Sequence, residues 1–276
     1  QSYDNWELII VDNNSTDNTD EVIASFKNNK IKVFKINNKG NIAKSRNLGI
    51  QKSKGEYIAF LDSDDYWLKD KLLVCSKYLE KEDGVGVCHA ETWDYIDNPY
   101  EKIIKSYGPE KNFTLRKLLE RGNCLSLSAV VIPRDYINLV GLFSEEDRFI
   151  TAEDYELWIR IAKNNLRIKF INENLGTFRL HSFSESSNFK KNANAIESII
   201  YHYSNEPIDI KKCLMKLWLN TGKQHHLNGC YKEAFKYYIK SLSYSRTFIL
   251  QIMYITALIL PHSILKALYK KIISKV

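Results

Sequence analysis

The chain has 276 residues, of which 44% are hydrophobic and 26% charged, so its composition is that of a globular protein with room for one large domain and a smaller one. Its 40 basic and 33 acidic residues give a net charge of +7, and it carries no known RNA- or DNA-binding motif, which favours an anionic surface over nucleic acid as a partner. Five scattered cysteines without a C-x-x-C pair argue against a zinc or disulfide framework and favour a reducing compartment.

Strands and helices alternate at short intervals in the first part of the chain. Trp6–Val11 is an apolar run that predicts a buried strand ending in Asp12, and Ile31–Ile36 predicts a second strand. Between Gly40 and Lys54 the spacing of apolar residues predicts a helix. This alternation is typical of an α/β fold with a mostly parallel, doubly wound sheet, whose ligands bind at the carboxyl ends of the strands.

The next predicted strand, Tyr57–Leu61, is followed by three carboxylates within four positions, Asp62, Asp64 and Asp65. Carboxylates this close repel one another unless a cation lies between them, and their hard oxygens suit Mn²⁺ or Mg²⁺ shared with substrate phosphates. The pattern therefore predicts a metal and diphosphate site. The alternative is a plain turn that caps the following helix. An EF-hand loop does not fit, because its glycine and closing glutamate are missing.

Beyond this point the chain continues as a helix and strand series, with a turn-rich stretch from Trp93 to Lys111. Helices are expected over residues 68–81 and 114–121, and strands over 85–88, 127–132, 168–171 and 175–180. The segment Thr151–Ala162 has helical spacing that places Glu153 and Asp154 in the first turn of a helix.

From about Asn194 the pattern becomes helical throughout, so we expect a first domain over residues 1–195 and a helical extension over residues 196–276. Phe248–Leu260 is an apolar run that is shorter than a membrane span, and lysines without acidic residues follow it. This arrangement predicts a helix lying on the membrane surface. The alternative is a buried packing helix.

Three motifs occur in order along the chain: V-D-N-N-S-T-D-N-T (11–19), L-D-S-D-D (61–65) and E-D-Y-E-L-W (153–158). Together with S-R-N (45–47) and F-R-L-H (178–181), they resemble the family 2 glycosyltransferases of the GT-A fold. The resemblance covers roughly residues 3–187 and rests on the whole set in this order and spacing, since each motif alone is weak.

The resemblance implies inverting transfer of a sugar from a nucleotide-diphosphate donor, with UDP-sugars favoured, to a glycan or lipid-linked acceptor in surface polysaccharide synthesis. It implies that Asp154 is the general base, which an inverting displacement needs to deprotonate the acceptor. The donor nucleotide is expected at Asp12, Arg46 and Asp62. The metal, Mn²⁺ or Mg²⁺, is expected at Asp64 and His181. Supporting roles are expected for Asp65, Glu153 and Arg179.

Each of these residues also has a simpler interpretation. The role of Asp12 could be limited to beginning an Asx-turn, and Arg46 could be a solvated helix residue without a charge partner. Asp154 could be only the acidic residue of a capping box that begins at Thr151. His181 could be an ordinary surface or core histidine.

In the family, a first strand and helix precede the position of Trp6, so we expect this chain to be N-terminally truncated, with an exposed sheet edge and an incomplete donor pocket. The resemblance and the basic tail together favour a cytoplasmic enzyme at the inner face of the membrane. Two alternatives stay open: a non-catalytic nucleotide-sugar-binding module, and a nucleotidyltransferase, although the Gly-rich phosphate loop usual in the latter is missing.

Overall fold

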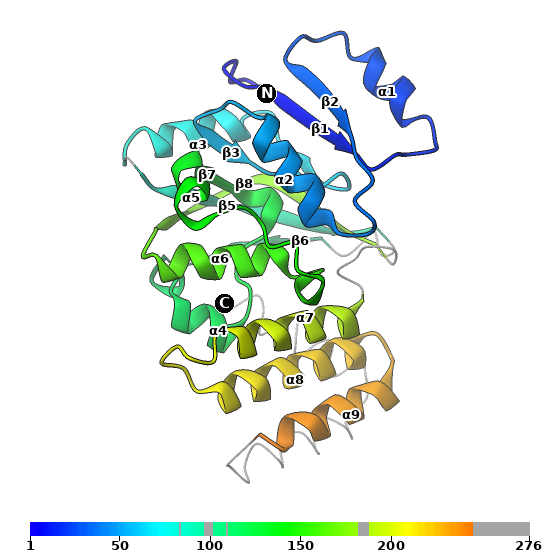
Figure 1. Ribbon diagram of the computed structural model, residues 1–276, viewed down its shortest axis with the longest axis vertical. Helices are drawn as coiled ribbons and strands as arrows, with labels where there is room; N and C mark the ends of the chain where they lie inside the picture. The colour runs from blue at the N-terminus through cyan, green and yellow to red at the C-terminus, as the bar shows by residue number, and fades with distance from the viewer. Residues whose placement is uncertain (83, 97–101, 109, 182–187, 245–276) are drawn as a thin grey trace. The chain divides into compact units, whose positions relative to one another are not determined.

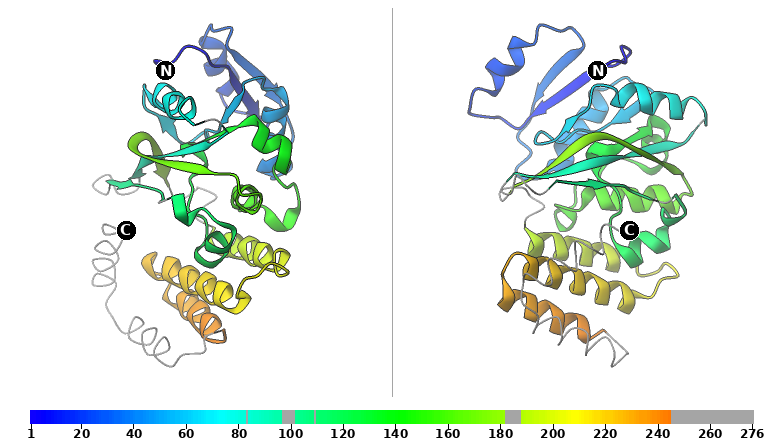
Figure 2. Two further views of the ribbon diagram at one scale, coloured as in Figure 1. Left: turned by 90° about the vertical axis from the view of Figure 1, so that its left-hand side faces the viewer. Right: turned by 180° about the vertical axis from the view of Figure 1, so that it is seen from behind.

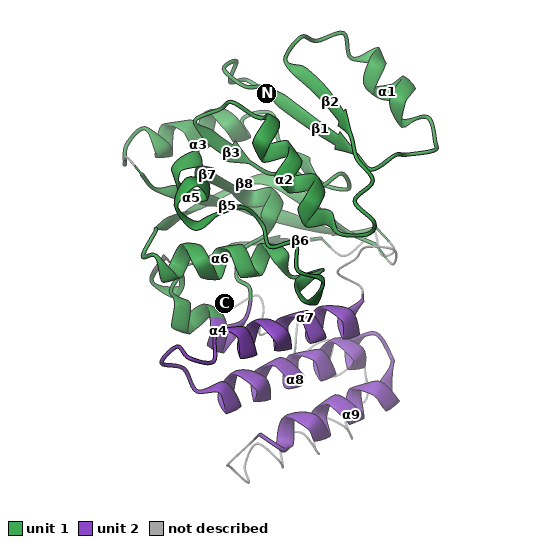
Figure 3. Cartoon of the chain, viewed as in Figure 1, with its two compact units in different colours: residues 1–118, 123–185 green, residues 119–122, 186–276 purple. Residues whose placement is uncertain are grey.

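The computed structural model describes residues 1–82, 84–96, 102–108, 110–181 and 188–244. The chain divides into two compact units, which are unit 1 (residues 1–118 and 123–185) and unit 2 (residues 119–122 and 186–276), coloured separately in Figure 3. The strands, labelled in Figure 1 except for β4, are β1 (Leu8–Asp12), β2 (Ile31–Lys35), β3 (Tyr57–Ala59), β4 (Tyr66–Trp67), β5 (Gly86–Tyr95), β6 (Lys102–Lys105), β7 (Val130–Pro133) and β8 (Ile168–Leu180). The helices are α1 (Thr19–Ser25), α2 (Ile42–Lys52), α3 (Lys71–Leu79), α4 (Leu115–Arg121), α5 (Arg134–Val140), α6 (Glu153–Lys163), α7 (Phe189–His202), α8 (Ile210–Leu227) and α9 (Tyr231–Leu242).

The first two strands form a small parallel sheet of their own. β1 and β2 pair in register from Leu8 opposite Ile31 to Asp12 opposite Lys35. Helix α2 packs against β1 and begins after Asn41, whose side chain accepts a hydrogen bond from the backbone of Ala43. The two strands and the helix predicted here are confirmed, and Asp12 lies at the carboxyl end of β1 as expected. The prediction that the first strand is buried is wrong, because β1 pairs only with β2, and its apolar residues are partly or largely exposed.

The second sheet has six strands in the order β3-β7-β5-β8-β4, with β6 beside the second half of β5. β5 and β8 are parallel, whereas β3–β7, β5–β7, β4–β8 and β5–β6 are antiparallel. The α/β class is confirmed, but the expected parallel arrangement does not hold in this mixed sheet. An apolar run shows that a strand is buried without showing its direction, so the sequence pattern could not separate the two cases.

Two strands are longer than predicted. β5 continues past Cys88 to Tyr95, and β6 pairs with its second half inside the stretch predicted to be turn-rich. The two strands expected over 168–171 and 175–180 are one strand, β8, whose pairing with β5 is irregular on either side of Ala90. Polar residues interrupt the apolar pattern in both strands, and this interruption is why the prediction ended them early.

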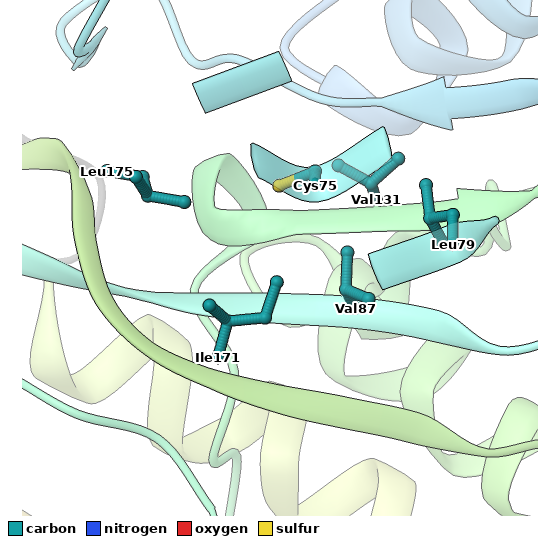
Figure 4. Packing of buried hydrophobic residues seen from close by; sticks show 6 residues of the cluster. All are labelled: Cys75, Leu79, Val87, Val131, Ile171 and Leu175. Atoms are coloured by element: carbon teal, nitrogen blue, oxygen red, sulfur yellow. The ribbon is translucent and has the colours of Figure 1, made fainter. Parts of the chain in front are cut away.

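A hydrophobic cluster joins α3 to the six-stranded sheet. Its members come from α3, β5, β7 and β8 and are each at most 6% exposed (Figure 4): Cys75, Leu79, Val87, Val131, Ile171 and Leu175. Figures 1 and 2 show α3 and α6 on opposite sides of β5 and β8. Helix α6 is itself buried along most of its length, from Glu153 in its first turn to Ala162.

Unit 2 contains the helices α7, α8 and α9, of which α8 packs against both of the others. Helix α8 begins after Asp209, whose side chain accepts a hydrogen bond from Lys212 N, and Trp218 on α8 is 1% exposed. Within the described part of the chain, no helix has both the length and the apolar character needed to span a bilayer. The apolar run Phe248–Leu260 and the lysines after it lie outside the described residues.

Candidate functional site

The acidic loop after β3 is a turn fixed by one of its own carboxylates. Asp65 N donates to the carbonyl oxygen of Asp62 at 3.1 Å, so the turn considered as an alternative is present. The Asp65 carboxylate accepts hydrogen bonds from Ser128 Oγ at 2.6 Å and from Arg179 N at 2.9 Å. Burial raises the pKa of Asp65 to about 7, although these two hydrogen bonds favour its charged form. Asp65 therefore anchors the loop, and Arg179 contributes through its backbone.

The two residues expected to bind a metal lie next to each other. His181 Nε2 is 3.2 Å from Asp64 Oδ2, and both side chains are partly exposed. The described residues contain no group of three or more His, Cys, Asp or Glu side chains placed to hold a metal ion. Two protein ligands with open positions fit Mg²⁺ or Mn²⁺ in a nucleotide site, because such ions take their other ligands from waters and substrate phosphates.

Arg46 connects three elements of the site. Its guanidinium, on α2, donates to Asp62 Oδ1 at 2.9 Å and to Glu153 Oε1 on α6. The side chain is 13% exposed, and its guanidinium carbon lies 5.6 Å from the centre of the Phe143 ring. The alternative of a solvated arginine without a charge partner is therefore wrong. A buried arginine between two carboxylates fixes the position of both.

Glu153 and Asp154 occupy the first turn of α6, as predicted, but it is Glu153 that accepts a backbone hydrogen bond from the residues before the helix. Glu153 Oε2 accepts a hydrogen bond from Thr151 N at 2.9 Å, and Ala152 is the N-cap residue. Thr151 has φ +82°, a left-handed conformation that is unusual for a β-branched residue. The interpretation of Asp154 as a capping-box acid is therefore wrong.

The Asp154 carboxylate is instead held by two donors. Its Oδ1 accepts from Tyr155 N at 2.7 Å, and its Oδ2 accepts from Asn123 Nδ2 at 3.2 Å. Burial and the adjacent Glu153 carboxylate raise the pKa of Asp154 to about 7, and the Arg46 guanidinium opposes this rise. A carboxyl group with a pKa near neutral pH is suited to general base catalysis.

Asp12 forms the local turn that was its simpler interpretation. Its carboxylate accepts hydrogen bonds from Ser15 N at 3.1 Å and from Ser15 Oγ, and Lys35 Nζ lies 3.8 Å away. The Ser15 hydrogen bonds hold the pKa of Asp12 below its usual value. The carboxylate is therefore charged at neutral pH and sits at the carboxyl end of β1, where a nucleobase contact stays a prediction.

A short segment that the sequence pattern did not single out, residues 123–128, contacts several carboxylates of the site. Asn123 binds Asp154, Ser126 Oγ donates to Glu91 at 3.2 Å, and Ser128 Oγ binds Asp65 while it accepts from Asp62 N at 3.1 Å. The signal in the sequence was the alternation of serines with leucines from Leu125 to Ser128, of which only the last two residues fell within a predicted strand. The start of that strand, predicted at 127, is wrong: Leu127–Ala129 form a 3-10 turn, and β7 begins at Val130.

Glu91 is the second feature that the sequence analysis missed. It is 1% exposed on β5, and besides Ser126 its carboxylate accepts from Tyr107 OH and from Trp93 Nε1 at 3.0 Å. Burial raises the pKa of Glu91, with the nearby Asp62 adding to the effect. The available signal in the sequence was an isolated glutamate shortly after the apolar residues of the predicted strand 85–88.

Replacing Ser128 with alanine is expected to destabilise unit 1 by about 1–3 kcal/mol, because Asp62 N and the buried Asp65 carboxylate each lose a partner. Urea unfolding followed by circular dichroism measures the change. The matched control is Ser25→Ala on α1, where an exposed hydroxyl donates to Val22 O and little change is expected. Equal midpoints for the two variants would show that Ser128 is not an anchor of the loop.

A comparison with known protein families matches residues 1–132 to the model described as "Glycosyl transferase family 2". Among curated proteins, the chain is 32% identical over 204 residues to the Escherichia coli UDP-Glc:alpha-D-GlcNAc-diphosphoundecaprenol beta-1,3-glucosyltransferase WfaP, covering 72% of this chain and 77% of that protein. It is 28% identical over 260 residues to the amylovoran biosynthesis glycosyltransferase AmsB of Erwinia amylovora, covering 91% of this chain and 83% of that one.

Two solved structures share the fold. Staphylococcus aureus TarS 1–349 in complex with UDP-GlcNAc superimposes with a TM-score of 0.55 at 19% identity, covering 86% of this chain and 70% of that chain. The mannosyltransferase PcManGT from Pyrobaculum calidifontis, in complex with GDP-Man and Mn²⁺, gives a TM-score of 0.55 at 13% identity. The superposition covers 91% of this chain and 70% of that chain. Both likenesses concern the arrangement of helices and strands.

Proposed function

Since the chain belongs to glycosyl transferase family 2 and has the GT-A fold, we propose that it is an inverting glycosyltransferase that moves a sugar from a UDP-sugar to a lipid-linked or glycan acceptor in surface polysaccharide synthesis. The observation that carries the proposal is the pair of adjacent carboxylates at the start of α6. One of them, Glu153, forms an ion pair with Arg46, while the other, Asp154, has a pKa near neutral pH.

In this proposal Asp154 accepts the proton of the acceptor hydroxyl as that oxygen attacks the anomeric carbon from the face opposite the leaving diphosphate. Asn123 and the backbone of Tyr155 orient the carboxylate. Arg46 holds Asp62 in place for the donor, and Asp12 contacts the nucleobase at the end of β1. Asp65, Glu153 and the backbone of Arg179 keep these groups in position.

Asp64 and His181 are the residues that would hold Mn²⁺ or Mg²⁺, which when bound acts as a Lewis acid on the diphosphate. Asp64 contributes a hard oxygen and His181 a ring nitrogen, a pair that Mn²⁺ accepts readily. The chain itself places this pair on the loop after β3 and at the end of β8, so donor binding depends on the contact between these two segments.

Turnover is expected to depend on pH through Asp154. The base acts only when ionised, and with a pKa of about 7 roughly half of it is ionised at pH 7 and about a tenth at pH 6. We therefore expect kcat at saturating donor to fall about tenfold per pH unit below about 7 and to level off above it. A profile that is flat down to about pH 5.5 would contradict the assignment of Asp154 as the base.

We further propose that the enzyme acts at the inner face of the cell membrane, with the predicted domain 1–195 carrying the reaction and the helices after it holding the protein near its acceptor. The name of the Escherichia coli relative WfaP describes an acceptor linked to diphosphoundecaprenol, which supports this location.

The direct test is a panel of UDP-, GDP- and dTDP-sugars, with binding and donor hydrolysis measured in the presence of Mn²⁺, Mg²⁺ or EDTA. We expect one nucleotide class, UDP, to bind in a metal-dependent way and to be hydrolysed slowly without an acceptor. A folded protein that binds no donor of any class would reject the proposal.

A further inference from the structure

Helix α9 in unit 2 carries apolar side chains on two sides. One side is buried against α8, where Ala234 is 0% and Tyr238 3% exposed. Next to this side, the helix presents Tyr231, Phe235 and Ile239, which are 51%, 50% and 50% exposed, and the Tyr231 ring also contacts the ring of His226 on α8. These three residues are spaced by four and lie along one line of the helix, over a length of about 12 Å. We call them the α9 stripe.

Lysines follow the α9 stripe along its length. Lys232 and Lys236 come directly after Tyr231 and Phe235, and both are exposed. Lys236 pairs with Glu233 at 2.7 Å, in an exposed ion pair of the kind that contributes little and exchanges easily with other anions. The helix therefore has an apolar line bordered by cations.

The positive charge of the whole chain is concentrated in the unit that carries this stripe. Residues 119–122 and 186–276 contain fifteen Lys and Arg but five Asp and Glu, a net charge of +10, while unit 1 contains 25 basic and 28 acidic residues, a net charge of −3. An apolar line bordered by lysines on a strongly basic unit is complementary to a surface that is apolar below an anionic layer.

We propose that unit 2 docks on an anionic lipid bilayer through the α9 stripe, with Phe235 and Ile239 entering the layer between headgroups and acyl chains. Tyr231 lies at the headgroup level, where tyrosine is favoured, and Lys232 and Lys236 face lipid phosphates. This deepens the proposed function, on which it rests for the location of the acceptor, and it assigns membrane contact to a described helix and not only to the chain after it.

A second copy of the chain is a poorer occupant of the stripe. Two basic units would repel each other, and three half-exposed side chains bury far less than the roughly 1,000 Å² of a stable interface. Binding to a bilayer does not require one helix to bury such an area. The electrostatic attraction of a basic unit to anionic lipids adds to the free energy gained when the apolar side chains insert.

The test is flotation of the full 276-residue chain with vesicles of phosphatidylcholine, alone or mixed with phosphatidylglycerol, without donor or acceptor. We expect binding to the mixed vesicles that weakens with salt, and a Phe235→Ser, Ile239→Ser variant that binds about tenfold more weakly. The matched control is Leu139→Ser on α5 of unit 1, where an apolar side chain 63% exposed is expected to make no difference.

Circular dichroism of the double variant checks that unit 2 is still folded. Equal binding by the folded double variant and the wild type would overturn the proposal and assign the contact to another part of the chain. Absence of wild-type binding would also overturn it, as would a dimer in size-exclusion chromatography that the double variant abolishes. The double variant is expected to hydrolyse the donor at the same rate as the wild type. Loss of vesicle binding with intact hydrolysis then concerns the docking surface alone, whereas absence of hydrolysis in both proteins concerns the proposed reaction.

Discussion

Asp154→Asn is expected to lower turnover by a factor on the order of 10³ and to leave donor binding unchanged. The amide has nearly the same shape as the carboxylate, and its single oxygen can keep the hydrogen bond from Tyr155 N. The hydrogen bond from Asn123 is lost, because an NH2 group replaces the oxygen that accepts it, and the amide cannot take up a proton. The expected loss is therefore in kcat, measured by product formation at saturating donor, while isothermal titration with the UDP-sugar gives the wild-type affinity.

The matched control for this change is Glu156→Gln, on the same helix two residues later. Glu156 is 3% exposed and pairs with Arg160 at 2.8 Å, away from the Arg46 bridge, so its loss costs stability and leaves kcat within a few-fold. If Asp154→Asn retained most of the wild-type kcat, the base would be another group. If the wild type itself showed no turnover while it bound donor, the chain would be a nucleotide-sugar-binding module.

Asp64→Ala is expected to remove the metal dependence of donor binding and to lower turnover by a factor on the order of 10³. Asp64 is the carboxylate of its loop that lies beside the other expected metal ligand, His181, whereas Asp65 is held by Ser128 and Asp62 by Arg46. Titration of the donor with and without Mn²⁺ measures the effect. EDTA is expected to weaken donor binding to the wild type to the level of the variant, and to have no further effect on the variant.

The matched control is Asp70→Asn, an exposed carboxylate at the N-terminal end of α3 whose side chain makes no cap hydrogen bond. It removes one negative charge near the loop, as Asp64→Ala does. The comparison therefore distinguishes the loss of a metal ligand from the effect of the lost charge on the electrostatic potential at the site. If Asp64→Ala bound donor with undiminished Mn²⁺ dependence, the metal would be held elsewhere. His181→Ala is the second variant to examine, and a smaller loss of the same kind is expected.

Much of the site could be predicted because its acidic residues come directly after recognisable strands or open a helix. Asp12 follows one apolar run, Asp62 and Asp64 follow another, and Asp154 lies in the first turn of a helix with clear periodicity. Local pattern was sufficient for these positions, because a carboxylate that ends an apolar run or opens a periodic helix is recognised from its neighbours in the chain alone. The chemical roles of these residues stay predictions until the variants are measured.

The remainder depends on contacts between residues far apart in the chain. The partners of Arg46 are 16 and 107 positions away, and Ser128 meets Asp65 across 63 positions. No periodicity encodes such pairs, because they follow from the order of strands in the mixed sheet, and strand direction was not readable. Glu91 was likewise left outside the strand predicted over 85–88, although it is buried within β5.

The segment 123–128 gives the site a particular genetic behaviour. It contacts Asp154, Glu91 and Asp65 through three different side chains, so a change that shifts its backbone alters the surroundings of all three carboxylates at once. Effects of substitutions at Asn123 and Ser128 are then expected to be non-additive with those at the carboxylates they touch. When this segment is exchanged with that of a relative, single replacements should be poorly tolerated, and a block transplanted whole should retain function. In evolution the segment would change as a unit, through compensating pairs of substitutions.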